Sequence, residues 1–319
     1  PYKHWREDVD FPAFEFRFIK EASTRLAGLL AGEIHMADIP EDLQRQALNQ
    51  GFKTLQGQVP ALRVFGTFMC CQFKDPKDPS QGVIDPTSPL MDVRVRKAMS
   101  KAVNFNDLNR AFFGGKGEVM INNPLHPIRP GWDKGWETRW QEEYGYDQAA
   151  ARNLLTQAGY TATNPLKVNL AVRPINGVPA AEDLAETLGG YWRQVGIDVA
   201  QRQVDPTQYQ AQTIGLQLFN DFALNATSAN AWTGIFNYGS SLLHRSPGPE
   251  QADVDELLNR IRGTMDLEQH DGLWRQVGEK LFTAHHFLPL FWLPTTVTYN
   301  PRVVADYTGE PIDLDIARV

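Results

Sequence analysis

The sequence is short of three things: long apolar runs, basic charge and cysteine. No apolar run is long enough to cross a bilayer as a helix. Acidic residues outnumber basic ones, 38 to 31, which gives a net charge of −7. This balance argues against a nucleic-acid-binding protein, because affinity for phosphates requires a basic surface. The length of 319 residues and the hydrophobic content of 42% suit one large domain or two lobes with a packed core.

The two cysteines are neighbours, Cys70 and Cys71, in the apolar stretch TFMCCQF. A disulfide between neighbouring residues is strained and rare. We therefore expect two buried, inert thiols, and the cysteine count alone does not indicate the redox compartment. The sequence opens on PYKHW and has no initiator Met, so we expect a processed or truncated product.

Signatures of common enzymes and metal sites are also missing. The stretch GGKGE (114–118) lacks the spacing of a phosphate-binding loop and the Ser or Thr that follows its Lys. Neither H-E-x-x-H nor G-x-S-x-G occurs. His285 and His286 are neighbours, so in a helix they diverge by about 100° and cannot share a metal ion. We expect no enzymatic activity, no metal and no cofactor.

Strand-like and helix-like segments alternate along the chain, which predicts an α/β fold. The predicted strands are 14–19, 33–39, 62–73, 166–173, 197–204 and 219–226. The predicted helices are 23–31, 41–49, 149–159, 180–194, 209–213, 254–264 and 267–283. The stretches 74–89 and 122–136 are predicted to be irregular because they are rich in proline. Prolines also limit the apolar stretch 287–300 to edge or irregular strand segments.

The stretch DVRVRKAMSKAVNFNDLNRAFFGG (92–115) predicts two short helices in succession. Asp92 is placed to cap the first helix and Asn106 the second. Gly114 ends the second helix. Four basic residues are expected on the exposed face: Arg94, Arg96, Lys97 and Lys101.

A polar and aromatic stretch, SANAWTGIFNYGSSL (228–242), is a candidate for ligand contact. Trp232 offers flat contact area, and Asn225, Ser228 and Asn230 offer adaptable hydrogen bonds, a mixture that suits a small polar ligand. An ordinary loop with one buried Trp explains the same composition equally well.

Five blocks of the sequence resemble the ABC-transporter solute-binding proteins of the oligopeptide, dipeptide and nickel class, known as family 5. They are LLAGEIHMADIP (29–40), PLMDVRVRKAMSKAVNFNDL (89–108), YGYDQAAARNLLTQAGY (144–160), WRQVGIDV (192–199) and the closing helices and strand (253–292). The second block followed by the third is the most specific part of the resemblance.

The resemblance implies a two-lobed periplasmic-binding-protein fold, class II and cluster C type, without the N-terminal part of lobe one. It places the rest of lobe one at 1–73, a hinge loop at 74–89, lobe two at 90–290 and the crossover back to lobe one at 291–319. In the family the double helix opens lobe two. Its basic face is then a surface of ordinary salt bridges or a contact with the transporter.

The implied function is that of an extracytoplasmic component of an ABC importer. Such a protein, periplasmic or lipid-anchored, captures a peptide or peptide-like small molecule between two lobes and delivers it to a membrane permease. We expect a monomer that binds no nucleic acid. The alternatives are a ligand-sensing or interaction protein of the same fold and, with less support, a hydrolase.

The expected ligand-binding residues are Asn225, Ser228, Asn230 and Trp232, with Phe291 and Trp292 near the crossover. For the last two a core role explains the apolar stretch FLPLFWL at least as well. Peptide-binding relatives carry an acidic residue for the ligand's amino terminus, which by position is Asn230 here, and a basic residue that appears as Leu224. Because Asn lacks the charge, the sequence departs from the standard peptide clamp.

Overall fold

The structure is a computed structural model, and it describes residues 13, 15–19, 21–75, 77–215, 217–218, 220–228 and 251–304. The chain divides into two compact units. Pro1–Gln56 and Thr296–Glu310 form the smaller unit, and Gly57–Thr295 with Pro311–Val319 form the larger one. The lobe boundaries implied by the resemblance stay a prediction.

The smaller unit takes its elements from both ends of the chain. It contains α1 (Ala22–Ala31), β1 (Met36–Ala37) and α2 (Glu41–Leu48), with the outer ends of β2 (Lys53–Met69) and β7 (Phe287–Tyr299). In β1, Met36 lies opposite Tyr299 of β7. Its core consists of Leu26, Leu29, Ile39 and Ala47. Both predicted helices are confirmed.

The predicted strand at 14–19 is wrong for the residues that the structure describes. Residues 15–19 have no regular secondary structure. The side chains of Phe16 and Phe18 are 87% and 91% exposed. These two aromatic side chains of the alternating pattern are therefore not buried, and alternation without burial does not specify a strand. The strand predicted at 33–39 is reduced to the two residues of β1.

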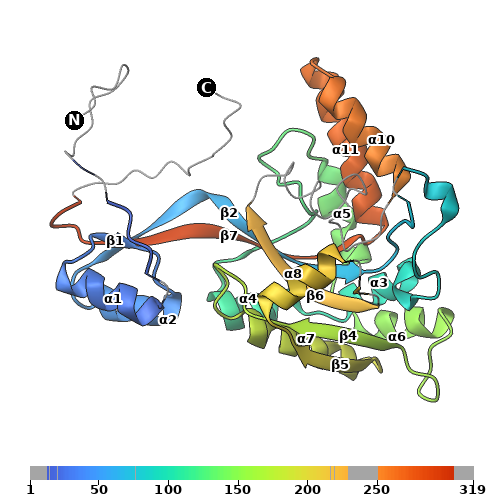
Figure 1. The fold of residues 1–319 in the computed structure, drawn as a ribbon, viewed down its shortest axis with the longest axis horizontal. Helices are drawn as coiled ribbons and strands as arrows, with labels where there is room; N and C mark the ends of the chain where they lie inside the picture. The colour runs from blue at the N-terminus through green and yellow to red at the C-terminus, as the bar shows by residue number, and fades with distance from the viewer. Residues whose placement is uncertain are drawn as a thin grey trace. The chain divides into compact units, whose positions relative to one another are not determined.

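The strand order in the sheet is β1-β7-β2-β6-β4-β5, with β3 (Glu118–Val119) paired to β7. The remaining strands are β4 (Lys167–Val172), β5 (Asp198–Gln203) and β6 (Asp221–Ser228). Strands β4, β5 and β6 are mutually parallel, whereas β2 runs antiparallel to β6. This mixed sheet with helices packed on it confirms the α/β class (Figure 1).

The expectation of an edge or irregular strand at 287–300 is wrong, because β7 is one continuous strand between β1 and β2. Among the described residues, β7 has two short neighbours: β3 lies opposite Phe291 and Trp292, and β1 lies opposite Thr298 and Tyr299. Neither proline of the strand lies opposite a residue of β1 or β3, so in these two pairings the missing N–H costs no ladder hydrogen bond.

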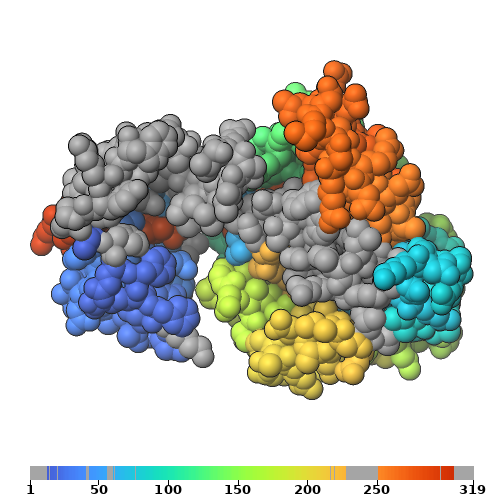
Figure 2. Space-filling model, turned by 45° about the horizontal axis from the view of Figure 1, so that its top comes forward, coloured from blue at the N-terminus to red at the C-terminus, as the bar shows by residue number. Residues whose placement is uncertain are grey.

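Ten helices of the larger unit lie within the described residues. They are η1 (Pro79–Gln81), η2 (Pro89–Met91), α3 (Val93–Lys101), α4 (Phe105–Phe113), α5 (Lys134–Glu143), α6 (Gln148–Gln157), α7 (Ala181–Gln194), α8 (Pro206–Ile214), α10 (Ala252–Gly263) and α11 (Leu267–Thr283). Helix α7 packs on β4, β5 and β6 (Figure 1). Helices α10 and α11 lie side by side and form the orange surface in Figure 2.

The main core is centred on Phe222 of β6. Its ring meets the rings of Phe68 and Trp192 edge-on, with centroids 5.3 and 4.7 Å away. On β2, a Cβ atom at Gly66 would come within 1.9 Å of the Phe222 ring. Glycine at this position therefore makes room for the ring that joins β2, β6 and α7.

Helix α5 was not predicted, and it begins inside the stretch predicted to be irregular. Asp133 caps it by accepting a hydrogen bond of 2.8 Å from the Gly135 amide. Trp136 is fully buried, and its indole N–H donates to Glu279 of α11 at 2.9 Å. Packing against α11 therefore stabilises a helix whose own pattern is weak.

The two helices predicted in 92–115 are confirmed as α3 and α4, but one cap is corrected. The Asp92 carboxylate accepts a hydrogen bond of 2.8 Å from the Arg94 amide, as predicted. The second helix begins two residues earlier than predicted, so its cap is Asn104, which accepts from the Asp107 amide at 3.2 Å. Asn106 is an exposed residue within α4. Gly114 ends α4 in the left-handed conformation, with φ of 58°.

The basic residues of α3 are not all exposed, which is a second correction. Arg96 is 6% exposed and donates hydrogen bonds to the carbonyl oxygens of Ala284, Leu90 and Met91 at 2.7, 2.6 and 2.9 Å. Burial lowers the pKa of Arg96 to about 10. Lys101 is also buried and donates to the Glu142 carbonyl at 2.9 Å. Both cationic side chains therefore donate hydrogen bonds to backbone carbonyl oxygens near the ends of neighbouring elements.

Cys70 and Cys71 form a disulfide, so the expectation of free thiols is wrong, although both residues are buried as expected. Neighbouring side chains of a regular strand point to opposite faces. Here β2 ends at Met69, and Cys71 adopts a left-handed backbone conformation with φ of 67°. This turn brings the two side chains together.

Candidate ligand-binding site

A polar cluster lies where β4 ends, beside the middle of β6. It consists of Arg173, Tyr209, Asn225 and Thr67, and is called the Arg173 cluster below. Arg173 directly follows β4, and Asn225 lies in β6, which runs parallel to β4. Tyr209 comes from α8, which is the yellow surface in Figure 2, and Thr67 comes from β2. The carboxyl ends of parallel strands are where open α/β sheets bind their ligands.

Asn225 is the centre of this cluster and is only 3% exposed. Its amide Nδ2 donates a hydrogen bond of 2.9 Å to the Thr67 hydroxyl. This bond turns the amide oxygen toward Arg173, whose Nη2 donates to it at 2.7 Å. The Tyr209 hydroxyl makes a longer contact of 3.5 Å with the same oxygen. Side chains from β2, from α8 and from the residue after β4 therefore fix one orientation of the Asn225 amide.

The guanidinium of Arg173 is held by neutral groups. Its Nη2 also donates to the Leu224 carbonyl at 2.9 Å, and its Cζ lies 4.0 Å from the centre of the Tyr209 ring. This distance is typical of a cation–π contact. Its Nε is buried and has no hydrogen-bond partner within the part of the chain that the structure describes. Among the described residues, no carboxylate forms an ion pair with Arg173.

Two carboxylates on the neighbouring elements, those of Asp221 and Asp205, are already engaged. Asp221 of β6 accepts a hydrogen bond of 2.6 Å from Arg202 of β5. Burial raises the pKa of Asp221, and the bond to Arg202 opposes this shift. Asp205 caps α8 by accepting from the Thr207 and Gln208 amides at 2.8 and 3.1 Å.

Successive side chains of β6 lie on opposite faces of the strand, so the residues of the main core are separated from those on the side of the Arg173 cluster. Phe222 and Leu224 belong to the core that includes α7, whereas Ala223 belongs to a second core with Tyr209. Leu224 is 2% exposed. Its side chain cannot supply the basic group that the resemblance implies at this position, but its carbonyl accepts from Arg173 of the adjacent strand.

The structure brings one of the six predicted site residues, Asn225, into the cluster. Ser228 is the last residue of β6, and the structure describes its backbone only. Asn230 and Trp232 lie outside the described residues. Their roles in binding stay predictions.

Phe291 and Trp292 are buried, with exposed fractions of 0% and 1%. The Phe291 ring packs against Phe113 with centroids 5.1 Å apart, and the Trp292 ring meets His126 at 5.2 Å. These contacts favour the core role that the sequence left open, and a role in ligand binding stays a prediction.

Sequence reasoning missed Arg173, Tyr209 and Thr67. For Arg173 a signal was available, because a charged residue directly after the buried strand LKVNLAV (166–172) lies at the carboxyl end of that strand. Tyr209 and Thr67 carry no such signal, since both meet the cluster only through tertiary packing.

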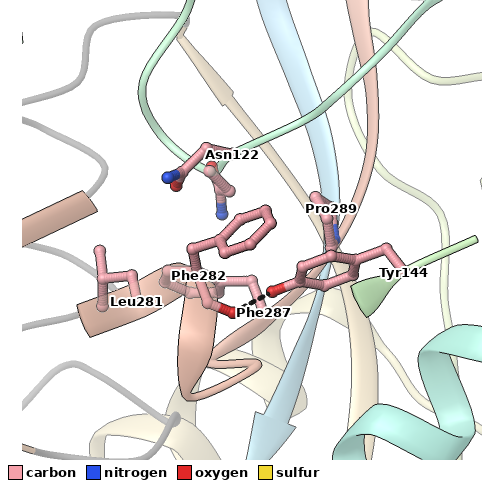
Figure 3. A pocket seen from close by; sticks show the side chains of 7 residues that line it. Asn122, Tyr144, Leu281, Phe282, Phe287 and Pro289 are labelled. Carbon is pink, nitrogen blue, oxygen red and sulfur yellow. Dashed lines mark hydrogen bonds between the residues drawn. The ribbon is translucent and has the colours of Figure 1, made fainter. Parts of the chain in front are cut away.

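A cavity between α5, α11 and β7 is too small to hold a peptide or another small-molecule ligand. Its lining includes Asn122, Tyr144 and Phe282, and the Tyr144 hydroxyl donates to the Phe282 carbonyl at 2.7 Å (Figure 3). The volume of about 10 Å³ admits about one water molecule.

The described part of the chain holds no group of three or more His, Cys, Asp or Glu side chains positioned to bind a metal ion. None of its helices is both long enough and apolar enough to span a membrane.

Known proteins resemble this chain in sequence. Heme-binding protein A of Haemophilus influenzae is 22% identical over 98% of this chain and 54% of its own length. The dipeptide-binding protein of Escherichia coli is 25% identical over 61% of this chain and 32% of its own length. The chain thus spans about half the length, or less, of these curated relatives.

A solved structure resembles the fold. The periplasmic binding protein DppA of Helicobacter pylori, in complex with the peptide STSA, has a TM-score of 0.69 at 19% identity. The match covers 89% of this chain and 52% of that protein. The fold of the chain is therefore that of the periplasmic binding proteins.

A family model, described as bacterial extracellular solute-binding proteins, family 5, middle part, matches residues 1–243. This match covers more than half of the chain, and it agrees with the fold. The chain belongs to the bacterial extracellular solute-binding proteins of family 5.

Proposed function

We propose that the protein is the extracytoplasmic solute-binding component of an ABC importer. It captures a peptide or peptide-like small molecule and delivers it to a membrane permease. It acts in the periplasm or on the outer side of the membrane with a lipid anchor, as a monomer and without catalysis. The observation that carries the proposal is the family match over residues 1–243.

The geometry of the larger unit supports this proposal. A binding protein needs preorganised polar groups that orient a small ligand. The Arg173 cluster provides them, because each amide and guanidinium orientation is fixed by a second hydrogen bond. The similar proteins include one solved in complex with a peptide, a dipeptide-binding protein and a heme-binding protein, and these indicate the candidate ligands.

A thermal-shift panel on the full-length protein tests the proposal. The panel contains short peptides, oligosaccharides, heme and a nickel–histidine complex. A ligand at one hundred times its dissociation constant stabilises a protein by about 2.7 kcal/mol, which a melting curve detects. We expect a shift with peptides. A panel without any shift contradicts the proposal.

A second measurement separates binding from hydrolysis. The protein is incubated with a peptide for a prolonged time, and the bound peptide is then released by denaturation. The mass of the released peptide is measured by mass spectrometry. We expect an intact peptide, and fragments would favour the hydrolase.

A further inference from the structure

The disulfide between Cys70 and Cys71 joins two neighbours at the turn that follows β2. A disulfide stabilises a protein mainly by closing a loop in the unfolded chain, and this effect grows with the length of the loop. A bond between adjacent residues closes the shortest loop that a chain can form, and it ties no distant segments together. Its effect therefore lies in the backbone of the turn itself.

Cys71 has a backbone conformation that its residue type disfavours. Within the described residues, three residues other than glycine have a positive φ: Cys71, Asn220 and His285. Asn and His are enriched in this left-handed region, whereas Cys is not among the enriched types. A Cβ atom there is crowded by the following carbonyl oxygen, so the conformation persists only where the surroundings constrain it. The covalent bond to Cys70 is such a constraint.

The chain that leaves this turn folds back on itself. The Gln72 carbonyl accepts a hydrogen bond of 2.8 Å from the Ile84 amide. Phe73 and Val83 lie opposite each other in an isolated antiparallel bridge. The direction in which the chain leaves Cys71 therefore decides where these paired residues lie relative to the end of β2.

This hairpin, residues 72–84, has few buried contacts of its own. Phe73 and Val83 are half-buried, and Lys74 and Gly82 are exposed. Segments with few buried contacts open more easily than a core. The attachment of the hairpin to the end of β2 is therefore sensitive to the backbone at Cys71.

Thiol–disulfide exchange with a dithiol opens the bond. Cys70 is fully buried and Cys71 is 7% exposed, so the Sγ atom of Cys71 is the point of attack. A thiolate of the dithiol bonds to this sulfur, the S–S bond breaks, and Cys70 leaves as a thiolate. The second thiol of the dithiol then attacks the mixed disulfide and releases Cys71. Two electrons and two protons pass to the protein, and the reductant leaves with a disulfide of its own.

We propose that the Cys70–Cys71 disulfide is a redox-sensitive switch for the hairpin. In the oxidised protein the bond holds Cys71 in the left-handed conformation and fixes the hairpin at the end of β2. A dithiol reduces the bond, Cys71 leaves this conformation, and the hairpin loosens while the sheet stays folded. This inference does not rest on the proposed function.

The test compares the oxidised protein with the protein treated with dithiothreitol at about pH 8, where thiolates form. Alkylation and mass spectrometry count the free thiols without denaturant. We expect none before treatment and both cysteines alkylated after it. Amide hydrogen exchange should become about tenfold faster in residues 72–84, and the amides of α7 should keep their rates.

Two double variants assign the effect to the backbone at position 71. Cys70→Ala/Cys71→Ala and Cys70→Ala/Cys71→Gly both lack the bond, and they differ only in the Cβ atom at position 71. The variant with Ala should show the fast exchange of the reduced protein. The variant with Gly should stay within about threefold of the oxidised protein, because Gly adopts a positive φ without a steric penalty. Dithiothreitol should change neither, and melting temperatures establish that both are folded.

The outcomes decide the inference without touching ligand capture. Faster exchange confined to residues 72–84 and reversed by reoxidation supports it. Thiols that are free before treatment, or a bond that dithiothreitol does not open in the folded protein, overturn it. Reduction without faster exchange in residues 72–84 also overturns it. Equal acceleration in α7 shows a bond that stabilises the whole unit, and equally fast exchange in the two double variants shows that the left-handed backbone is not the link; either result overturns the inference.

Discussion

Glu143, at the end of α5, links two basic groups from other elements. Its carboxylate accepts a hydrogen bond of 2.6 Å from Lys97 and lies 3.1 Å from Nε2 of His285. The hydrogen bond with His285, followed by that with Lys97, lowers the pKa of Glu143 to about 2. Burial lowers the pKa of His285, which keeps the ring neutral at pH 7.

Both shifts predict that acid destabilises the fold. A carboxylate with a lowered pKa stabilises the fold above its unfolded pKa of 4.5, and this contribution is lost as the pH falls from 4.5 to about 2. Glu143→Gln should therefore lower stability by about 1–3 kcal/mol at pH 7 and much less at pH 2. Denaturant unfolding across this range measures the difference. Glu142→Gln, a change at an exposed neighbour, should leave the pH profile unchanged; a similar profile for both variants would contradict the assignment.

At the scale of the element, the sequence and the structure differ on where α4 begins: the sequence predicts Asn106 as its cap, and the structure has Asn104. Asn104→Ala removes the cap and should lower the free energy of unfolding by about 1 kcal/mol. Asn106→Ala, the matched control, lies at an exposed position inside the helix, where Ala is favoured, and should change stability by less than about 0.5 kcal/mol. Chemical denaturation of the two variants compares them. A larger loss of stability in Asn106→Ala than in Asn104→Ala would instead support the helix start predicted from the sequence, with Asn106 as the cap.

Most helices were predictable because their signals are local. Asp92 and Asp147 cap α3 and α6, and a single apolar face defines α7. Elements that depend on distant partners were not predictable. Helix α5 needs Glu279 of α11, and the continuity of β7 depends on how short its neighbours are.

The candidate site divides in the same way. Asn225 was predicted from composition, and it lies in the cluster. The orientation of its amide depends on Thr67, 158 residues away in sequence, which no local pattern encodes. The same holds for Arg173, whose stacking partner Tyr209 comes from α8. A sequence shows which polar residues are available. Which of their side chains meet in space depends on how the strands of the sheet are paired.

At the scale of the whole molecule, the smaller unit depends on the end of β7. Thr298 is fully buried and lies opposite Ala37 of β1. Thr298→Pro removes an N–H and restricts the backbone inside the strand, which should disrupt this pairing. We expect amide hydrogen exchange in α1 and α2 to become at least about tenfold faster. The amides of α7, in the larger unit, are the internal control and should keep their rates. Unchanged exchange in α1 and α2 would show that the smaller unit does not need this pairing.

The division of the smaller unit between the two ends of the chain also sets an order of assembly. Residues 57–295 of the larger unit are continuous, whereas α1, β1 and α2 must wait for the segment that begins at Thr296. A ribosome adds about 5–20 residues each second, so the roughly 240 intervening residues take about 12–50 s. For that interval the first helices are made but lack their strand partner. Helices α1 and α2 are thus made before the larger unit, but the smaller unit can complete its fold only after residues 57–295 of the larger unit have been made.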